Sequence, residues 1–175
     1  MPVPLPPRMY AGRMTTGTPR ITTIAGGGTD PGDGLPALST ALTTPTGAAI
    51  DALGNLFIAD YGGHRIRMLP QRDLVVHGQA VTAGRLYTVA GTGEAGHGPE
   101  GQPATRTALN GTAEVWVHGS HLFIVDYMGS RLLMVPGTTG RFFGQEMTAG
   151  HGYRLAGTGV FGYSGDGGPG PDAAI

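Results

Sequence analysis

The hydrophobic and polar positions of this chain follow patterns that are typical of short strands joined by turns. Residues 56–59 form an apolar run, Leu-Phe-Ile-Ala, which predicts a strand buried on both faces. Asp60 ends the run, and residues 61–63 supply a tight turn with two glycines. Residues 64–68 then alternate, with two arginines on one face and His64, Ile66 and Met68 on the other. The stretch 54–68 is therefore predicted to be a β-hairpin.

The same pattern recurs further along the chain. Residues 122–134 repeat the run of residues 56–68, including the Asp-Tyr pair after the strand and the methionine at the end. Further matches at nearly the same offset are Ile24-Ala25-Gly26, Val89-Ala90-Gly91 and Leu155-Ala156-Gly157. We interpret the chain as a tandem repeat with a period of about 66 residues.

Each repeat is predicted to contain four short antiparallel strands. They fall at residues 47–51, 55–60, 64–69 and 85–90 in the first repeat, and at 113–117, 121–126, 130–135 and 153–156 in the second. A glycine-rich entry loop precedes each unit, and a long connection joins the third strand to the fourth. Four strands joined by turns, with no amphipathic helical window, describe a propeller blade. The sequence thus predicts an all-β fold, either a partial β-propeller or one that closes by oligomerisation.

The repeat divides the chain into four parts. Residues 1–19 form a proline-rich lead-in with the outer strand of an incomplete blade, and residues 20–84 form the first blade with its entry loop. Residues 85–150 form the second blade, and residues 151–175 an outer strand and the glycine-rich linker of a next blade. Propellers typically close with 4–8 blades. We therefore expect these two blades to be completed either by the remainder of a longer propeller or by other copies of the chain in a homo-oligomer. A trimer of two-bladed copies would close a six-bladed ring.

Composition supports a turn-rich fold and argues against several partners. Glycine accounts for 33 of the 175 residues, whereas only 13% of the residues are charged. The net charge of −1 gives no electrostatic basis for binding nucleic acid. No apolar run reaches about 18 residues, so no membrane insertion is expected. The absence of cysteine excludes disulfides and thiolate metal sites.

Residues 45–60 and His64-Arg65-Ile66-Arg67 resemble the NHL-repeat family of β-propellers. The loop at residues 162–169 resembles the linker of long bacterial members, such as actinobacterial and teneurin-like proteins. The second blade departs from the family pattern at Gly111, where a proline is usual, and at the turn 118–121. The resemblance implies a propeller that presents one face to a protein, peptide or glycan, and an extracytoplasmic location. Related six-bladed propellers include lyases and hydrolases that use a central metal.

An acidic residue and an arginine recur at a spacing of five across the turn of each hairpin. These pairs are Asp60 with Arg65 and Asp126 with Arg131. The carboxylate can accept turn N–H groups and hold the arginine, which would fix the hairpin. Since repeats preserve what every blade needs, we interpret the pairs as structural.

Polar or aromatic residues that the repeat does not duplicate are the better candidates for ligand contacts. His64 and Arg67 have Ser130 and Leu133 as their counterparts in the second blade. A tryptophan on the first strand of the second blade offers a ligand platform or, more simply, packs between blades. The candidate ligand-binding set is His64, Arg65, Arg67, Trp116 and Arg131.

Metal and catalytic signals are sparse. His118 and His121 are three residues apart and, with a nearby acid, are the weak candidates for zinc. The aligned loop acids Asp33, Glu100 and Asp166 offer one carboxylate each and favour capped turns over calcium. No Lys-Ser/Thr follows the glycine-rich loops, and no Gly-x-Ser-x-Gly occurs. We therefore predict no cofactor and assign no catalytic residue.

These observations lead to one main functional hypothesis and two alternatives. The main hypothesis is a non-catalytic binding or scaffolding module for protein, peptide or glycan ligands. The first alternative is part of a metal-dependent propeller lyase or hydrolase, which needs inward-facing ligands from several blades. The second is a self-assembling ring or filament component, driven by exposed strand edges and blade faces.

Overall fold

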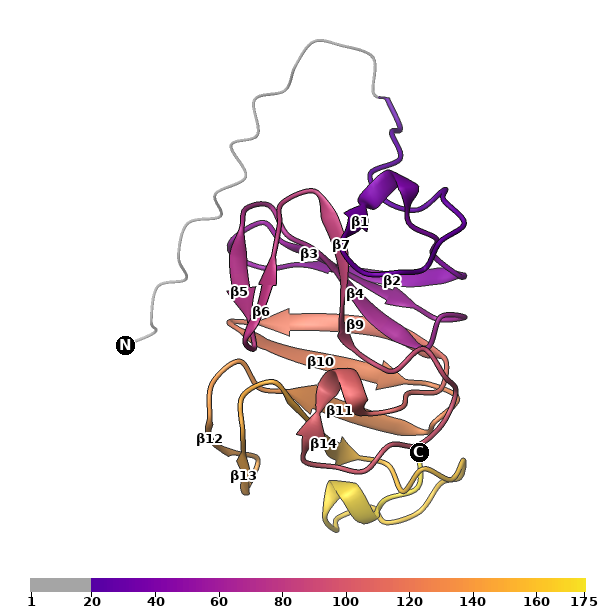
Figure 1. Cartoon of the computed structure of the whole chain (residues 1–175). Coiled ribbons are helices and arrows are strands. Elements are labelled where there is room, and N and C mark those ends of the chain that lie inside the picture. The colour runs from indigo at the N-terminus through magenta and orange to yellow at the C-terminus, as the bar shows by residue number, and fades with distance from the viewer. Residues whose placement is uncertain (1–19) are drawn as a thin grey trace, which may run out of the picture.

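A computed structural model describes residues 20–175, which form two antiparallel five-stranded sheets packed against each other (Figure 1). The strand order of the first sheet is β1-β7-β4-β3-β2. Its strands are β1 (Leu35–Pro36), β2 (Pro45–Ile50), β3 (Leu56–Asp60), β4 (Arg65–Leu69) and β7 (Arg85–Ala90). The all-β fold predicted from the sequence is confirmed, because the helical segments of the described residues are three short 3₁₀ turns. These are η1 (Ala37–Ser39), η2 (Ala104–Arg106) and η3 (Gly170–Asp172).

The second sheet repeats the topology of the first in the order β8-β14-β11-β10-β9. Its strands are β8 (Gln102–Pro103), β9 (Thr112–His118), β10 (His121–Asp126), β11 (Arg131–Val135) and β14 (His151–Ala156). The four long strands of each sheet fall where the repeat places them. The short edge strands β1 and β8 were not predicted. They arise because each entry loop folds back along the fourth strand, as in the pairing of Leu35 with Leu86.

A two-stranded hairpin lies in each long connection, where the sequence pattern predicted no structure. The hairpins are β5 (Leu74–Val76) with β6 (Gln79–Val81), and β12 (Gly140–Phe142) with β13 (Gln145–Met147). Both tip residues of each turn have positive φ, 48° and 85° at His77-Gly78 and 49° and 82° at Phe143-Gly144. This is the geometry of two-residue hairpin turns, but their usual signal is Asn-Gly or Asp-Gly, and His-Gly and Phe-Gly are weaker signals of such a turn.

The main hydrophobic core lies between the two sheets. The first sheet contributes Phe57, Ala59, Ile66 and Met68, and the second contributes Val115, Leu122, Ile124, Leu133 and Val135. A smaller cluster on the other side of the first sheet joins Ile58, Leu69 and Leu86 to Ala37 of η1. Strand β3 is therefore buried on both faces, as its continuous apolar run predicts.

The strand predicted at residues 85–90 as the fourth of the first repeat is β7 of the first sheet. Strand β7 pairs with β4, so a repeat boundary between residues 84 and 85 cuts through this sheet. The outer strand expected within residues 1–19 lies outside the described residues. Within residues 20–175, no helix has the length and apolar character needed to cross a membrane.

Candidate functional site

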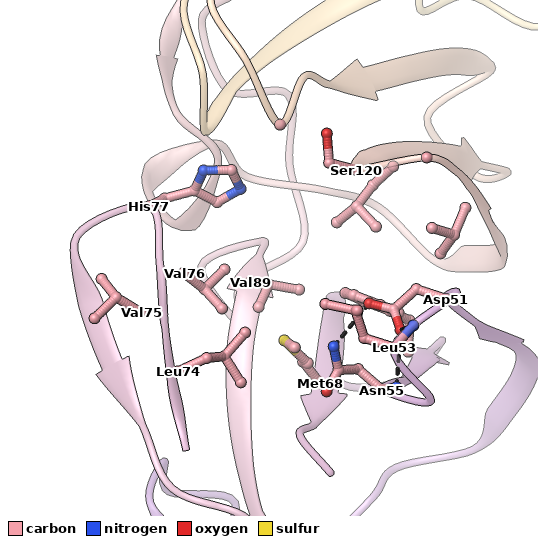
Figure 2. Close-up of a pocket in the computed structure, with 15 residues that line it drawn as sticks. Asp51, Leu53, Asn55, Met68, Leu74, Val75, Val76, His77, Val89 and Ser120 are labelled. Atoms are coloured by element: carbon pink, nitrogen blue, oxygen red, sulfur yellow. Dashed lines mark hydrogen bonds between the residues drawn. The ribbon is translucent and has the colours of Figure 1, made fainter. Parts of the chain in front are cut away.

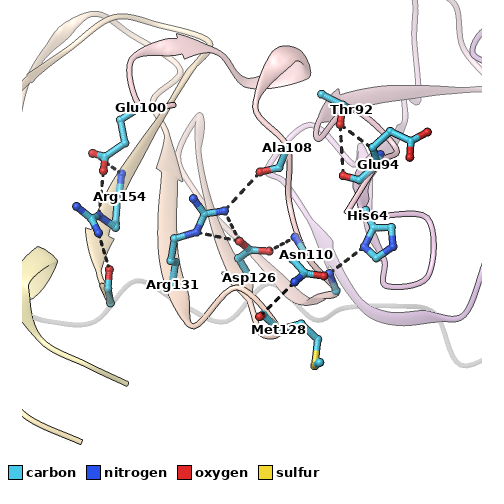
Figure 3. Close-up of polar contacts among 12 residues, drawn as sticks. His64, Thr92, Glu94, Glu100, Ala108, Asn110, Asp126, Met128, Arg131 and Arg154 are labelled. Atoms are coloured by element: carbon cyan, nitrogen blue, oxygen red, sulfur yellow. Dashed lines mark hydrogen bonds and ion pairs between the residues drawn. The ribbon is translucent and has the colours of Figure 1, made fainter. Parts of the chain in front are cut away.

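The turn pair of the second blade forms as predicted. Oδ2 of Asp126 accepts hydrogen bonds from Nε and Nη2 of Arg131, at 3.0 Å and 2.5 Å (Figure 3). Both side chains are buried, and Oδ1 of Asp126 accepts the backbone N–H of Asn110. The pair therefore fixes the β10–β11 hairpin and the end of the entry loop, and it leaves Arg131 with little surface for a ligand.

The turn pair of the first blade does not form. Asp60 is fully buried, and its Oδ1 accepts the backbone N–H of Thr43, but its Oδ2 has no hydrogen-bond partner. Arg65 instead donates from Nη1 to the carbonyl of Pro31, at 3.3 Å. Burial raises the pKa of Asp60, because desolvation outweighs the Thr43 N–H and the charges of Arg65 and Arg67.

Arg67 is a structural residue rather than a surface ligand contact. Its side chain has no exposed area, and it donates to the carbonyls of Pro31 and Gly32, at 2.8 Å and 3.1 Å. Its Nη2 lies 3.2 Å from Oδ1 of Asp33, which also accepts the N–H and hydroxyl of Thr88. Arg67 and Asp33 thus hold the first entry loop against β4 and β7.

The second blade achieves the same anchoring with a different arrangement of residues. Leu133 stands where the first blade has Arg67, and Arg154 stands where it has Thr88. Oε1 of Glu100 lies 2.9 Å from Nε of Arg154, and Oε2 accepts the Arg154 N–H (Figure 3). Arg67 pairs with Thr88 across β4 and β7, and Leu133 pairs with Arg154 across β11 and β14. The arginine that anchors the entry loop therefore lies on the third long strand of the first sheet and on the fourth long strand of the second.

His64 joins the two blades. Its Nδ1 accepts the backbone N–H of Gly111, at 3.0 Å, and its own backbone has a positive φ of 49° (Figure 3). The expectation that Gly111 replaces a proline is wrong, because Thr112 pairs with Asp126 as Pro45 pairs with Asp60, so Gly111 matches Thr44, which also has positive φ. The N–H of Gly111 supplies a hydrogen bond between the blades.

The other sequence candidates do not converge on one site. Nδ1 of His121 accepts the N–H of Gly137, and its ring packs edge-on against Phe142. His118 pairs with His121 across the β9–β10 turn. Within residues 20–175, no three His, Asp or Glu side chains gather closely enough to hold a metal ion. Trp116 lies on β9 with 71% of its surface exposed.

The structure adds a cavity between the two blades that the sequence did not predict (Figure 2). It has a volume of about 210 Å³. Its interior is apolar, and it is closed on one side by the β5–β6 hairpin. The lining includes Phe57, Met68, Leu74, Val76, Val89, Val117 and Leu122, with Asp51, His77, Gly119, Ser120 and Gly137 among the other residues.

The polar groups of the Asp51 turn are already satisfied within the protein. Oδ1 of Asp51 accepts the N–H groups of Leu53 and Asn55, and Oδ2 accepts Nδ2 of Asn55. The facing turn of the second blade carries Gly119 and Ser120, and it is one residue shorter, because Val117 pairs with Leu122 whereas Ile50 pairs with Leu56. These small residues leave the mouth of the cavity open. The cavity depends on packing between repeats, so no local sequence signal reveals it.

The tip of the β5–β6 hairpin reaches the second blade. The ring of His77 lies so close to Gly150 that a Cβ at Gly150 would come within 2.6 Å of it. Burial and the neighbouring His151 lower the pKa of His77. The hairpin therefore spans the boundary between the blades and frames the cavity.

Two sheets with the same topology, stacked with β9 against β2 and β3, define a β-propeller-type repeat. Residues 42–68, which contain β2, β3 and β4, match the family model of the NHL repeat. The chain thus carries an NHL repeat, as the resemblance of residues 45–60 predicted. No curated protein matches the chain.

Proposed function

We propose that this chain is a non-catalytic binding module that takes an apolar side chain of a protein or peptide into the cavity between its blades. The observation that carries this proposal is the apolar lining of a cavity that opens to the surface. Small-molecule and peptide sites are usually concave and mostly apolar. Two apolar side chains at its rim, Leu53 and Val75, are 53% and 68% exposed and extend the apolar surface outward.

The polar candidates support a protein or peptide ligand better than a glycan. Arg67, Arg131 and Asp126 are buried in internal contacts, and His64 is bonded to the second blade. Glycan hydroxyls need free donors and acceptors, which a wall of valine, leucine, phenylalanine and methionine lacks. Ser120 and the His77 ring provide polar atoms near the cavity mouth for a peptide backbone.

Titration of the ¹⁵N-labelled protein with small probes tests this function. We expect N-acetyl-leucine amide and N-acetyl-phenylalanine amide to produce saturable amide shifts at Leu53, Val75 and Ser120. Affinities of about millimolar are expected, because single capped residues have few atoms. N-acetyl-aspartate amide and glucose serve as polar probes that should leave these amides unchanged.

The substitution Ser120→Leu narrows the cavity mouth and should abolish the shifts. Ser164→Leu makes the same change at an exposed serine on the third entry loop and should preserve them. The proposal is contradicted if glucose shifts these amides and the apolar probes do not, or if Ser120→Leu binds the apolar probes as well as the wild type does.

A further inference from the structure

Among residues 20–175, the outer face of the second sheet carries an apolar patch that is only partly covered, since Phe143 packs edge-on against Phe123. The apolar patch consists of Trp116, Phe123, Val125 and Leu132, of which Trp116 and Val125 are 71% and 38% exposed. The exposed Glu114 lies beside the patch, and Ala48 and Ala49 of β2 line its edge. Trp116 pairs with Phe123 across β9 and β10, which places both side chains on this face. At an offset of 66 residues, Phe123, Val125 and Leu132 correspond to Phe57, Ala59 and Ile66 of the first sheet. Those three residues form the face of the first sheet that packs on the second.

The first sheet has a complementary open region on its opposite face. A hollow of about 310 Å³ lies there, lined by Ile24, Ala25, Leu42, Pro45, Thr46, Gly47, Ala48, Leu56 and Ile58. By the repeat, Leu56 and Ile58 match Leu122 and Ile124, which are buried against the first sheet. The hollow therefore corresponds to a surface that a neighbouring blade covers elsewhere in this chain.

The sizes of equivalent side chains differ between the two blades, and large and small side chains are complementary both between the blades and at the two open surfaces. Strand registers align Ala49 with Trp116, since their partners Phe57 and Phe123 match, and align Ala48 with Val115. Between the blades, the small Ala49 belongs to the same core as the larger Val115. At the open surfaces the larger residue lies on the other partner: the outer face of the second sheet carries the large Trp116, and the open face of the first sheet carries the small Ala48 beside a recess.

We propose that the chain binds a second copy of itself head to tail, with the outer face of the second sheet seated on the open region of the first sheet. The indole of Trp116 enters the hollow beside Ala48. The contact follows the inner strands β9 and β10 of one copy and β2 and β3 of the other. The outer strands of the first sheet are already covered, because Ala37 packs with Leu69 and Leu86.

This contact is heterologous, because each copy uses two different surfaces. It is also independent of the proposed ligand cavity, which lies between the two blades of one chain. A test can therefore separate the two proposals, since Trp116 does not line that cavity.

Light scattering of the whole chain across a concentration series, combined with tryptophan fluorescence, tests the contact. Trp116 is the only tryptophan in the sequence, so its emission reports on this face alone. We expect the mass to rise above 17.9 kDa with concentration, while the emission shifts to the blue and acrylamide quenching falls. Trp116→Ser should weaken association at least tenfold, and Val75→Ser, on the hairpin, should leave it unchanged.

A pair of blocked variants tests the head-to-tail geometry. Trp116→Ser removes the inserted side chain, and Ala48→Trp fills the hollow, so each variant alone should stay monomeric. Their mixture should form a 1:1 dimer, because the Ala48→Trp chain keeps Trp116 and the Trp116→Ser chain keeps the hollow. Circular dichroism spectra of both variants establish that they fold, as expected for substitutions at exposed positions.

Three outcomes overturn the proposal. The first is a wild-type chain that stays monomeric to about 0.5 mM, a concentration at which contacts with micromolar to sub-millimolar dissociation constants are populated. The second is an Ala48→Trp chain that associates like the wild type, which indicates a symmetric contact between outer faces. The third is a monomer in which Trp116 is already shielded at low concentration, which indicates that the chain covers its own face.

Discussion

At the scale of single residues, equivalent positions in the two blades carry different interactions. Asp126 holds Arg131, whereas Asp60 leaves one carboxylate oxygen without a partner because Arg65 turns to the Pro31 carbonyl. The carbonyls of the first entry loop attract two neighbouring arginines, 65 and 67. In the second blade, Leu133 replaces the second of these arginines and Arg131 turns to its aspartate.

Replacement of each aspartate by asparagine should therefore have unequal effects. Asp126→Asn leaves Arg131 as an unpaired buried charge, and we expect it to lower the free energy of unfolding by about 3–5 kcal/mol. Asp60→Asn breaks no ion pair and keeps the bond from Thr43, so a change of less than about 1 kcal/mol in either direction is expected. Urea unfolding at pH 7 measures both, and equal losses would contradict the assigned contacts.

The raised pKa of Asp60 also predicts a pH dependence. Between the ordinary value of 3.8 and the higher folded value, the folded state holds a proton that the unfolded state has released. Asp60 therefore reduces stability as pH rises through this window, and the cost is complete above the folded pKa. The stability of Asp60→Asn relative to the wild type should improve from pH 3.5 to pH 7. A flat difference across this range would show that Asp60 titrates normally.

We expect the anchors of the two entry loops to be exchangeable between the blades. Arg67→Leu leaves Asp33 and two loop carbonyls without their cation, and should cost about 1–3 kcal/mol. Adding Thr88→Arg and Asp33→Glu recreates the Leu133, Arg154 and Glu100 arrangement, and should recover at least half of that loss. Thr88→Arg alone is the control, because it places a second cation beside Arg67 and should destabilise. Thermal unfolding of the three variants decides whether the arrangements are equivalent.

The sequence could predict the hairpin aspartates but not the role of Arg67. The spacing of five between aspartate and arginine is a local signal, and one of the two pairs forms. An alternating strand with arginines is ordinarily taken as exposed on its polar face, yet Arg67 is buried beneath the entry loop. Only the three-dimensional return of that loop onto β4 reveals its contacts.

At the scale of elements, the long strands were predictable and the additional hairpins were not. The strands have continuous or alternating apolar patterns, whereas each hairpin is three residues per strand and turns through a non-glycine residue with positive φ. The hairpin of the first blade has a structural role, since Leu74 and Val76 pack against the core between the sheets.

Acidification should loosen the hairpin of the first blade. The pKa of His77 is lowered from 6.5, so the folded state binds fewer protons, and stability is lost as pH falls from 6.5 through the folded value. His77→Asn keeps a residue that tolerates positive φ and should remove this dependence. Amide hydrogen exchange at Gln79 and Val81 measures the opening. The equivalent amides of β13 are an internal control, because Phe143 occupies the turn there and does not titrate.

At the scale of the whole molecule, the sequence repeat predicted two equivalent blades, and the sheets confirm this. The repeat did not predict how the blades are joined, because the joining residues differ between its two copies. The bond from Gly111 to His64 depends on two residues that the repeat does not duplicate. The cavity and the two open faces likewise arise from small differences in size, such as Ala48 against Val115.

The shared core implies that the two blades unfold together. Ile66 has no exposed surface and lies in the core that joins the sheets. Ile66→Ala should lower the free energy of unfolding by about 2–4 kcal/mol, because it leaves a cavity at this junction. Hydrogen exchange should then accelerate by a similar factor in β3 of the first blade and β10 of the second. Val75→Ala, at an exposed position on the hairpin, should change neither.

If exchange accelerated in β3 alone, each blade would be an independent unit, and the core between them would contribute little to the stability of the second. Neighbouring repeats that stabilise each other through one interface should instead lose protection together.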